Sequence, residues 1–175
     1  VAAPAKNPSH GSIAAAIAPA DICLYASTRL LPSTASREMA SRIVASPRLL
    51  NLQWNQVVLY PVGKVAMDVP VRASVRLPTG WRQASALAVE PGVADAALVR
   101  FETVPLEVLV DSPLFAGPNF ANYDLTPEGS APVRLNVFGD DAADVKATPE
   151  QVELHRALVR EMVSALGPPR FDRYD

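Results

Sequence analysis

The clearest pattern along the chain is a strict alternation of apolar and polar side chains between residues 71 and 77. Apolar positions alternate there with charged or hydroxyl-bearing positions: Val71, Arg72, Ala73, Ser74, Val75, Arg76 and Leu77. A period of two places successive side chains on opposite faces of a strand. The pattern therefore predicts a strand with one buried face and one solvated face.

Several other short runs predict strands, and prolines fall mainly between them. A run rich in β-forming residues covers 52–60, and a turn at 78–80 precedes a partner strand over 81–89. Further strands are expected over 97–103 and 133–137, while 104–110 is expected to be a short strand or a turn of helix. Short strands joined by turns predict a mainly β fold, an antiparallel β-sandwich-like domain.

The pattern changes to a helical period after residue 148. Thr148 is a suitable N-cap, Pro149 suits the first helical position, and Gln151 can complete a capping box. Gly167, followed by two prolines, marks the end. Apolar residues recur at helical spacing in this segment: Leu154, Leu158, Val159, Met162, Val163 and Leu166. The sequence therefore predicts one C-terminal amphipathic helix of about five turns, whose apolar side must pack on the sandwich or on a neighbouring domain.

The first 48 residues carry no comparable signal. Prolines at positions 4, 8, 19, 32 and 47 interrupt every candidate element. We expect mobility over 1–20 and a short helix over 33–45. The apolar stretch 13–20 is short and contains Pro19, so a signal peptide has little support. The compartment, cytoplasmic or periplasmic, stays open.

Composition and charge exclude several classes of protein. The net charge is −2, and the 16 basic residues form no run that could attract nucleic acid. No stretch approaches the roughly 20 apolar residues that span a bilayer, so we expect neither a nucleic-acid partner nor a membrane span. The single cysteine, Cys23, cannot form an intramolecular disulfide and is interpreted as a small buried hydrophobic residue.

The residues that catalysis requires do not form any of the common catalytic patterns. A zinc peptidase needs two histidines one helical turn apart, with a glutamate beside them. His155 lies in the predicted helix, but no histidine follows it at four residues, and His10 is distant in sequence. The chain also has no Gly-x-Ser-x-Gly motif and no phosphate-binding glycine loop. We therefore predict no catalytic, cofactor-binding or metal-binding residue in this chain.

Three other groups of side chains have both a functional and a structural interpretation. Asp140, Asp141 and Asp144 could bind calcium, but a solvated acidic turn before a helix N-terminus is favoured. The Asp-Ser-Pro sequence at 111–113 could be a nucleophile site, but a turn held by side-chain to backbone bonds is commoner. Aromatic residues in strands could form a ligand platform but are more often core: Trp54, Tyr60, Trp81 and Phe101.

Five phrases occur in a characteristic order along the chain. They are NLQWNQVVLYP at 51–61, PVRASVRLPTGW at 70–81, LEVLVDSPLFAG at 106–117, PEQ at 149–151 and FDRYD at 171–175. Together they resemble the glycyl aminopeptidase family of zinc metallopeptidases, which carry an N-terminal β-domain, a thermolysin-like catalytic domain and a PDZ domain. The resemblance covers residues 49–175.

The resemblance implies a domain organisation and a parent enzyme. It divides the chain into a poorly matched, partly disordered leader over 1–48, the N-terminal β-domain over 49–138, and a linker with the first catalytic-domain helix over 139–175. The implied parent uses zinc-activated water to remove small N-terminal residues from peptides. The family's His-Glu-x-x-His motif lies beyond the matched phrases, so the chain is expected to be a fragment that is inactive alone. The implied partners are the missing catalytic domain and the parent's peptide substrates.

The alternative is a freestanding β-sandwich binding module without catalytic activity or, more remotely, a structural assembly protein. A binding module would carry a helix docked on a complete sheet. A fragment would instead expose the apolar side of the helix and could self-associate through it. Rapid proteolytic loss of the helix by cleavage within 139–147 would favour the fragment.

Overall fold

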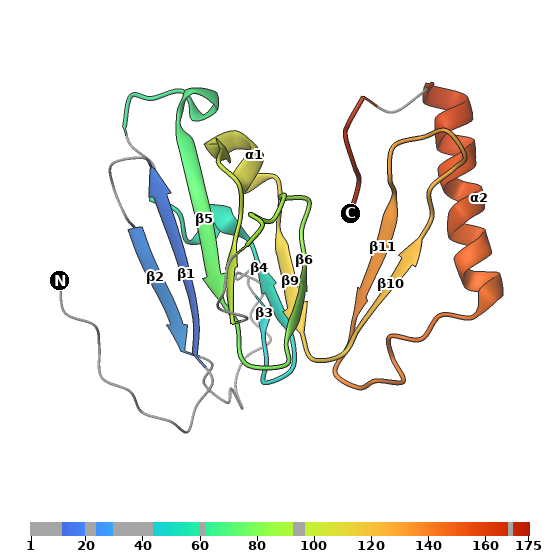
Figure 1. The fold of residues 1–175 in the computed structure, drawn as a ribbon, viewed down its shortest axis with the longest axis horizontal. Coiled ribbons are helices and arrows are strands. Elements are labelled where there is room, and N and C mark those ends of the chain that lie inside the picture. The colour runs from blue at the N-terminus through green and yellow to red at the C-terminus, as the bar shows by residue number, and fades with distance from the viewer. Residues whose placement is uncertain (1–11, 20–23, 30–43, 60–61, 93–96, 168–169) are drawn as a thin grey trace.

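The chain folds into a β-sandwich followed by a β-hairpin and a long helix (Figure 1). The computed structural model describes residues 12–19, 24–29, 44–59, 62–92, 97–167 and 170–175. Strands in the described residues form three sheets, and the longest described helix is C-terminal. The predicted fold class, mainly β with one C-terminal amphipathic helix, is confirmed.

The first sheet of the sandwich is centred on the strand that the alternating pattern predicts. Its strand order is β2-β1-β5-β7, β8 also pairs with β5, and all of these pairings are antiparallel. Buried and exposed positions alternate along β5, which confirms the predicted period of two. The strands are β1 Ser12–Pro19, β2 Leu24–Arg29, β5 Pro70–Arg76, β7 Leu98–Arg100 and β8 Val104–Pro105.

The second sheet has the order β3-β4-β9-β6, again antiparallel throughout. Gly80, with a φ of 83°, allows the predicted turn before β6, and Trp81 donates its backbone N–H to the Pro78 carbonyl at 3.1 Å. The strand predicted over 81–89 is shorter than expected and pairs with β9 rather than with β5. The strands are β3 Val44–Ala45, β4 Leu50–Leu52, β6 Arg82–Ala84 and β9 Leu114–Gly117.

The hydrophobic core lies between these two sheets and receives Leu106 and Leu109 from the short helix α1, Leu106–Val110. The Trp54 and Phe101 rings meet edge to face at its centre, with their centroids 6.3 Å apart. Trp81 packs against the core from its margin, while Tyr60 lies outside the described residues. The interpretation of the described aromatic residues as core is therefore confirmed.

The strand predicted over 52–60 is wrong for most of its length. Only Leu52 belongs to a strand, and Trp54–Gln56 instead form a 3₁₀ turn, η1. The Val57 N–H donates to the Trp54 carbonyl at 3.0 Å. The backbone groups of this turn therefore bond to residues three positions away and not to a neighbouring strand. Burial of the Trp54 indole explains why this turn prevails over the β-propensity of the following valines.

The N-terminal region also differs from expectation. Ser12–Pro19, where mobility was expected, forms β1 and pairs with both β2 and β5. The helix expected over 33–45 falls mostly on residues 30–43, which lie outside the described residues, and its last two residues form β3. Residues 104–110 contain both of the expected alternatives, because strand β8 is followed directly by the short helix α1.

The remaining elements form a separate layer beside the sandwich. A two-stranded antiparallel sheet consists of β10, Phe120–Asp124, and β11, Arg134–Phe138. Helix α2, Pro149–Leu166, begins with the predicted capping box and ends at Gly167, whose φ is 83°. The helix prediction is confirmed, and α2 lies against the hairpin on the side away from the sandwich (Figure 1).

A single glycine marks the passage from the sandwich to the hairpin. A Cβ atom on Gly117 would lie 2.6 Å from the backbone carbonyl oxygen of Arg48, closer than real Cβ contacts allow. Glycine is therefore required here by close backbone approach rather than by its φ. No helix in the described part of the chain is long and apolar enough to cross a membrane.

The Trp54→Phe substitution should destabilise the sandwich by about 1–3 kcal/mol, because the Trp54 Nε1–H donates to the buried Ser112 carbonyl at 2.8 Å. Urea unfolding monitored by far-UV circular dichroism measures the change. Trp81→Phe is the matched control, since Trp81 is only partly buried. Equal losses in the two variants would mean that the indole hydrogen bond contributes nothing specific.

Candidate functional site

Helix α2 has two adjacent apolar sides, and the hairpin covers only one of them. Val152 is buried in a small cluster with Leu125 and Val133, and Val159 packs at the edge of that cluster. On the neighbouring side, aliphatic residues four positions apart are largely exposed: Leu154 (71%), Leu158 (57%), Met162 (51%) and Leu166 (81%). An exposed apolar side of this kind typically marks a contact surface.

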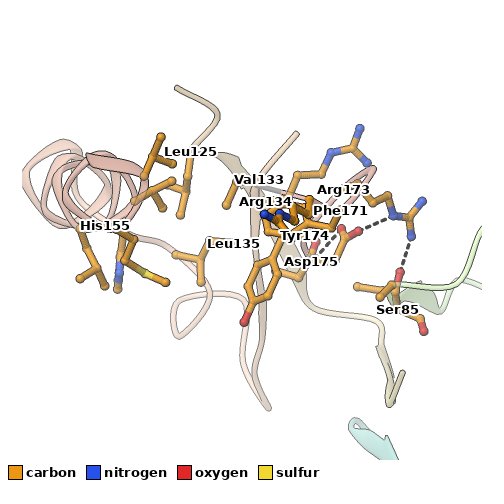
Figure 2. A pocket seen from close by; sticks show the side chains of 18 of the residues that line it. Ser85, Leu125, Val133, Arg134, Leu135, His155, Phe171, Arg173, Tyr174 and Asp175 are labelled. Atoms are coloured by element: carbon orange, nitrogen blue, oxygen red, sulfur yellow. Dashed lines mark hydrogen bonds and ion pairs between the residues drawn. The ribbon is translucent and has the colours of Figure 1, made fainter. Parts of the chain in front are cut away.

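Three residues of this exposed side, Leu158, Met162 and Leu166, lie in one wall of a groove of about 910 Å³. The opposite wall comes from the C-terminal residues and from the sandwich at Ser85 and Phe115, and the floor includes Leu135 of β11. Figure 2 shows the helix on one side of this space and the C-terminal residues Arg173 to Asp175 on the other. The groove is therefore formed by the sandwich, the hairpin with its helix, and the C-terminal residues, which are far apart in sequence.

The C-terminal residues form a short parallel pairing with the chain at the start of β11. Tyr174 bridges Val133, the Arg134 N–H donates to the Tyr174 carbonyl at 2.9 Å, and the Tyr174 N–H donates to the Pro132 carbonyl at 2.8 Å. This segment, residues 170–175, is called the C-terminal tail below. Its backbone is thus held against the hairpin by two hydrogen bonds.

Arg173 fastens the tail to the sandwich. Its guanidinium donates to the backbone carbonyls of Ser85 and, at 3.0 Å, of Leu87 (Figure 2). Its Nε also forms an ion pair of 2.6 Å with the Asp175 carboxylate, whose other oxygen accepts a hydrogen bond from the Asn136 amide at 3.2 Å. The Asp175 side chain is only 8% exposed. A partly buried ion pair whose two side chains also bond to neighbouring groups fixes geometry better than an exposed pair.

The residues with candidate chemistry are not brought together. His155 is exposed on α2 and lines the groove, but no group of three or more His, Cys, Asp and Glu that could hold a metal occurs among the described residues. His10 and Cys23 lie outside those residues. The donors in the described part of the chain therefore do not fit a zinc site, and no catalytic step through zinc is assigned to them.

The acidic cluster before α2 forms a turn with local partners. The Asp141 carboxylate pairs with Arg48 at 2.7 Å, the Asp144 carboxylate accepts the Asp141 N–H at 3.2 Å, and Asp140 accepts from Ser46 at 3.4 Å. These contacts connect the turn to the sandwich. They agree with the interpretation of a solvated acidic turn.

The Asp-Ser-Pro sequence ends helix α1. The Ser112 hydroxyl donates to the Val108 carbonyl at 2.7 Å, and the buried Ser112 carbonyl accepts from Trp54 and Ser85. The hydroxyl is thus engaged in a side-chain to backbone bond, as the structural interpretation predicts. Asp111 is exposed at the rim of the groove.

The Arg173→Met substitution should release the C-terminal tail, because it removes the guanidinium that contacts the Ser85 and Leu87 carbonyls. We expect the Arg134 amide, which donates to Tyr174, to exchange with solvent about tenfold faster, as loss of roughly 1.4 kcal/mol would give. Hydrogen exchange followed by NMR measures this rate. The exposed Arg170→Met is the control, and similar rates in both variants would contradict the role of Arg173.

The pKa of Asp124 lies below its ordinary value of 3.8, chiefly because the Thr126 hydroxyl and backbone N–H donate to its carboxylate. Because the folded-state pKa is lowered, the associated stabilisation is present above pH 3.8 and is lost as the pH falls through the folded pKa. Thr126→Val should raise the pKa of Asp124 towards 3.8 in a carboxyl-carbon NMR titration. Thr148→Val, which alters a hydroxyl near Glu150 instead, should leave it unchanged.

Comparison with known proteins identifies the family of the sandwich. The family model for the peptidase M61 N-terminal domain matches residues 29–118, just over half of the 175-residue chain. The match begins upstream of residue 49, where the sequence resemblance starts, and ends one residue after β9. A search of curated proteins found no match. The chain belongs to the peptidase M61 N-terminal domain family.

Proposed function

We propose that this chain is the non-catalytic N-terminal part of a zinc-dependent aminopeptidase, that α2 is the first helix of its catalytic domain, and that the α2 groove receives the rest of that domain. The family match supports a peptidase, and the five phrases that resemble glycyl aminopeptidases support the finer assignment. The observation that carries the docking proposal is the exposed apolar side of α2.

The exposed side of α2 is chemically suited to a protein partner. Burying a single leucine or methionine side chain contributes roughly 1.5–3 kcal/mol, and Leu158 and Met162 are both more than half exposed. Most of the side chains that line the groove are apolar, and charged groups such as Arg170 and Asp111 lie among them. Apolar centres with polar margins are characteristic of protein interfaces.

The sandwich would then act as a rigid wall beside the catalytic cleft. Zinc-bound water in the catalytic domain would supply the attack on the first peptide bond. This chain would contribute shape, because its described residues offer no zinc site and its Asp-Ser-Pro hydroxyl is bonded to backbone. The wall would limit which peptide ends reach the cleft.

The double substitution Leu158→Ser and Met162→Ser tests the docking surface. We expect it to weaken binding to a separately expressed remainder of the M61 catalytic domain, without the α2 segment, at least about tenfold, since it removes apolar area worth more than roughly 1.4 kcal/mol. Sedimentation velocity or calorimetry measures the affinity. Both side chains are largely exposed, so the unfolding free energy of the isolated chain should change by less than about 0.5 kcal/mol per site.

Val62→Ser is the matched control, because Val62 is 98% exposed on the sandwich and away from the groove lining. It should leave the affinity unchanged. Equal affinity of the wild type and the α2 double variant for the catalytic domain would overturn the docking proposal. A freestanding binding module would then become the better assignment.

The chain alone should not hydrolyse glycyl or alanyl chromogenic substrates in the presence of zinc, because its described residues hold no metal-binding group. Release of the chromophore, followed by absorbance, measures this. A preparation treated with a chelator is the control for contaminating peptidase. Turnover that copurifies with the chain and is abolished by the chelator would show that it is itself catalytic.

A further inference from the structure

We propose that a polar cleft between β6 and the hairpin binds a carboxylate group of a peptide through the guanidinium groups of Arg82 and Arg134. This cleft, of about 360 Å³, adjoins the α2 groove, and Arg134 lines both. Its lining is mostly polar, whereas that of the α2 groove is mostly apolar. The proposal is tested on the chain alone, so it stands or falls independently of the docking proposal.

The hairpin divides its side chains between two faces. Tyr123 and Leu135, which are partners in the antiparallel register, pack in the cluster beneath α2. The neighbouring pair, Asn122 and Asn136, lies on the opposite face because side chains alternate along a strand. This opposite face forms one wall of the cleft, and β6 of the sandwich forms another. The hairpin therefore turns its polar face towards the sandwich and its apolar face towards α2 (Figure 1).

The charges that line the cleft are mostly positive. Three arginines line it, Arg82, Arg134 and Arg173, and Asp175 is the one acidic residue on the lining among the described residues. Arg173 and Asp175 form an ion pair with each other, which leaves the charges of Arg82 and Arg134. This positive surface belongs to a chain whose net charge is −2. A concave surface with charge of one sign attracts a ligand of the opposite sign.

Arg82 is held in place by an aromatic ring and not by an acidic partner. Its guanidinium carbon lies 4.3 Å from the centre of the Phe120 ring, and the centroids of the Phe120 and Phe138 rings are 4.6 Å apart. A guanidinium that stacks on a ring keeps the N–H groups at its edge available to an anion. In the part of the chain that the structure describes, the Arg82 side chain has no hydrogen bond or ion pair.

Arg134 lines the cleft from the hairpin side. Its backbone N–H donates to the Tyr174 carbonyl at 2.9 Å, which fixes the start of β11 against the C-terminal tail. Asp124 lies opposite Arg134 in the register, but its carboxylate accepts from the Thr126 hydroxyl and backbone N–H. Within the described residues the Arg134 guanidinium forms no ion pair or hydrogen bond. Its donors, like those of Arg82, are therefore available to a ligand.

The donors on the two sides of the cleft favour a carboxylate. Each guanidinium presents a planar pair of N–H groups that matches the two oxygens of a carboxylate. The Asn122 and Asn136 amides, which bond to each other at 2.7 Å, also line the cleft and suit the peptide group that precedes a carboxylate. Membership of a peptidase-domain family favours a peptide as the carrier. A C-terminal carboxylate and an acidic side chain share this chemistry, and the experiment separates them.

The test titrates the chain with three short peptides at low ionic strength. Acetyl-Gly-Gly-Gly carries only a C-terminal carboxylate, acetyl-Gly-Asp-Gly-amide carries only a side-chain carboxylate, and acetyl-Gly-Gly-Gly-amide carries neither. We expect the Nε–H NMR signals of Arg82 and Arg134 to shift with at least one carboxylate peptide and to stay in place with the neutral peptide. The carboxylate peptide with the lower dissociation constant identifies the source of the carboxylate.

Arg82→Gln and Arg134→Gln should each weaken this binding at least about fivefold, since each removes a charge-assisted contact. Arg100→Gln is the matched control and should leave the affinity unchanged, because Arg100 is exposed on β7 and lies outside the cleft lining. Far-UV circular dichroism establishes that each variant keeps its fold.

Three results would overturn the proposal. One is the absence of a shift with both carboxylate peptides, or an equal shift with the neutral peptide. Another is the same affinity in the two cleft variants as in Arg100→Gln. The third is tighter binding of inorganic phosphate than of both carboxylate peptides, because the cleft would then be a phosphate site.

Discussion

Burial of apolar surface is divided unequally between the two parts of this molecule, and the remaining architecture follows from that division. The sandwich encloses one continuous core that includes the fully buried Trp54 and Phe101. Beneath α2 the cluster has only three buried members, Leu125, Val133 and Val152. Two strands are too narrow to cover an eighteen-residue helix with two apolar sides. The uncovered side is therefore a necessary result of a small hairpin, and polar contacts must help to hold the helix.

Those polar contacts are specific and lie at the first half of the helix. The Arg156 guanidinium donates to the Asp124 carbonyl at 3.0 Å. The Tyr123 hydroxyl donates to the Val145 carbonyl at 2.9 Å and accepts the Ala147 N–H at 2.7 Å, just before the Thr148 cap. The second half of α2 has no comparable bond in the described residues, and there the exposed aliphatic side chains are most prominent. Anchoring at one end and apolar exposure at the other are consistent with a helix that meets a second surface.

The parts of the fold that the sequence predicted best are those governed by local periodicity. The alternation along β5 and the capping box of α2 are both local signals, and the structure follows them closely. The expected strand over 52–60 was wrong because its outcome depended on a hydrogen bond from Trp54 to Ser112, which is 58 residues away. Strands β9 and β10 were not predicted, since neither shows a clean alternation.

The candidate site was predicted in part for the same reason. Helical spacing identified an apolar side of α2 that would lie exposed or meet a neighbour, but it gave no indication of the opposite wall of the groove. That wall depends on Arg173 reaching the Ser85 and Leu87 carbonyls and on one parallel bridge at Val133, and no short-range pattern encodes either contact. Only the family resemblance of the phrase at 171–175 distinguishes this segment in the sequence.

The close approach of Gly117 to the Arg48 carbonyl has a mechanical consequence. Strand β9 ends at Gly117 and β10 begins at Phe120, so only two residues separate the sandwich from the hairpin. Asn119 also donates to the Asp140 carbonyl at 2.7 Å, which braces the far end of the same crossing. A close contact and a hydrogen bond at so short a joint restrict bending there, so the spacing between helix and sandwich is largely set before any partner arrives. Recognition at such a preset spacing would lose little conformational entropy and would discriminate by shape.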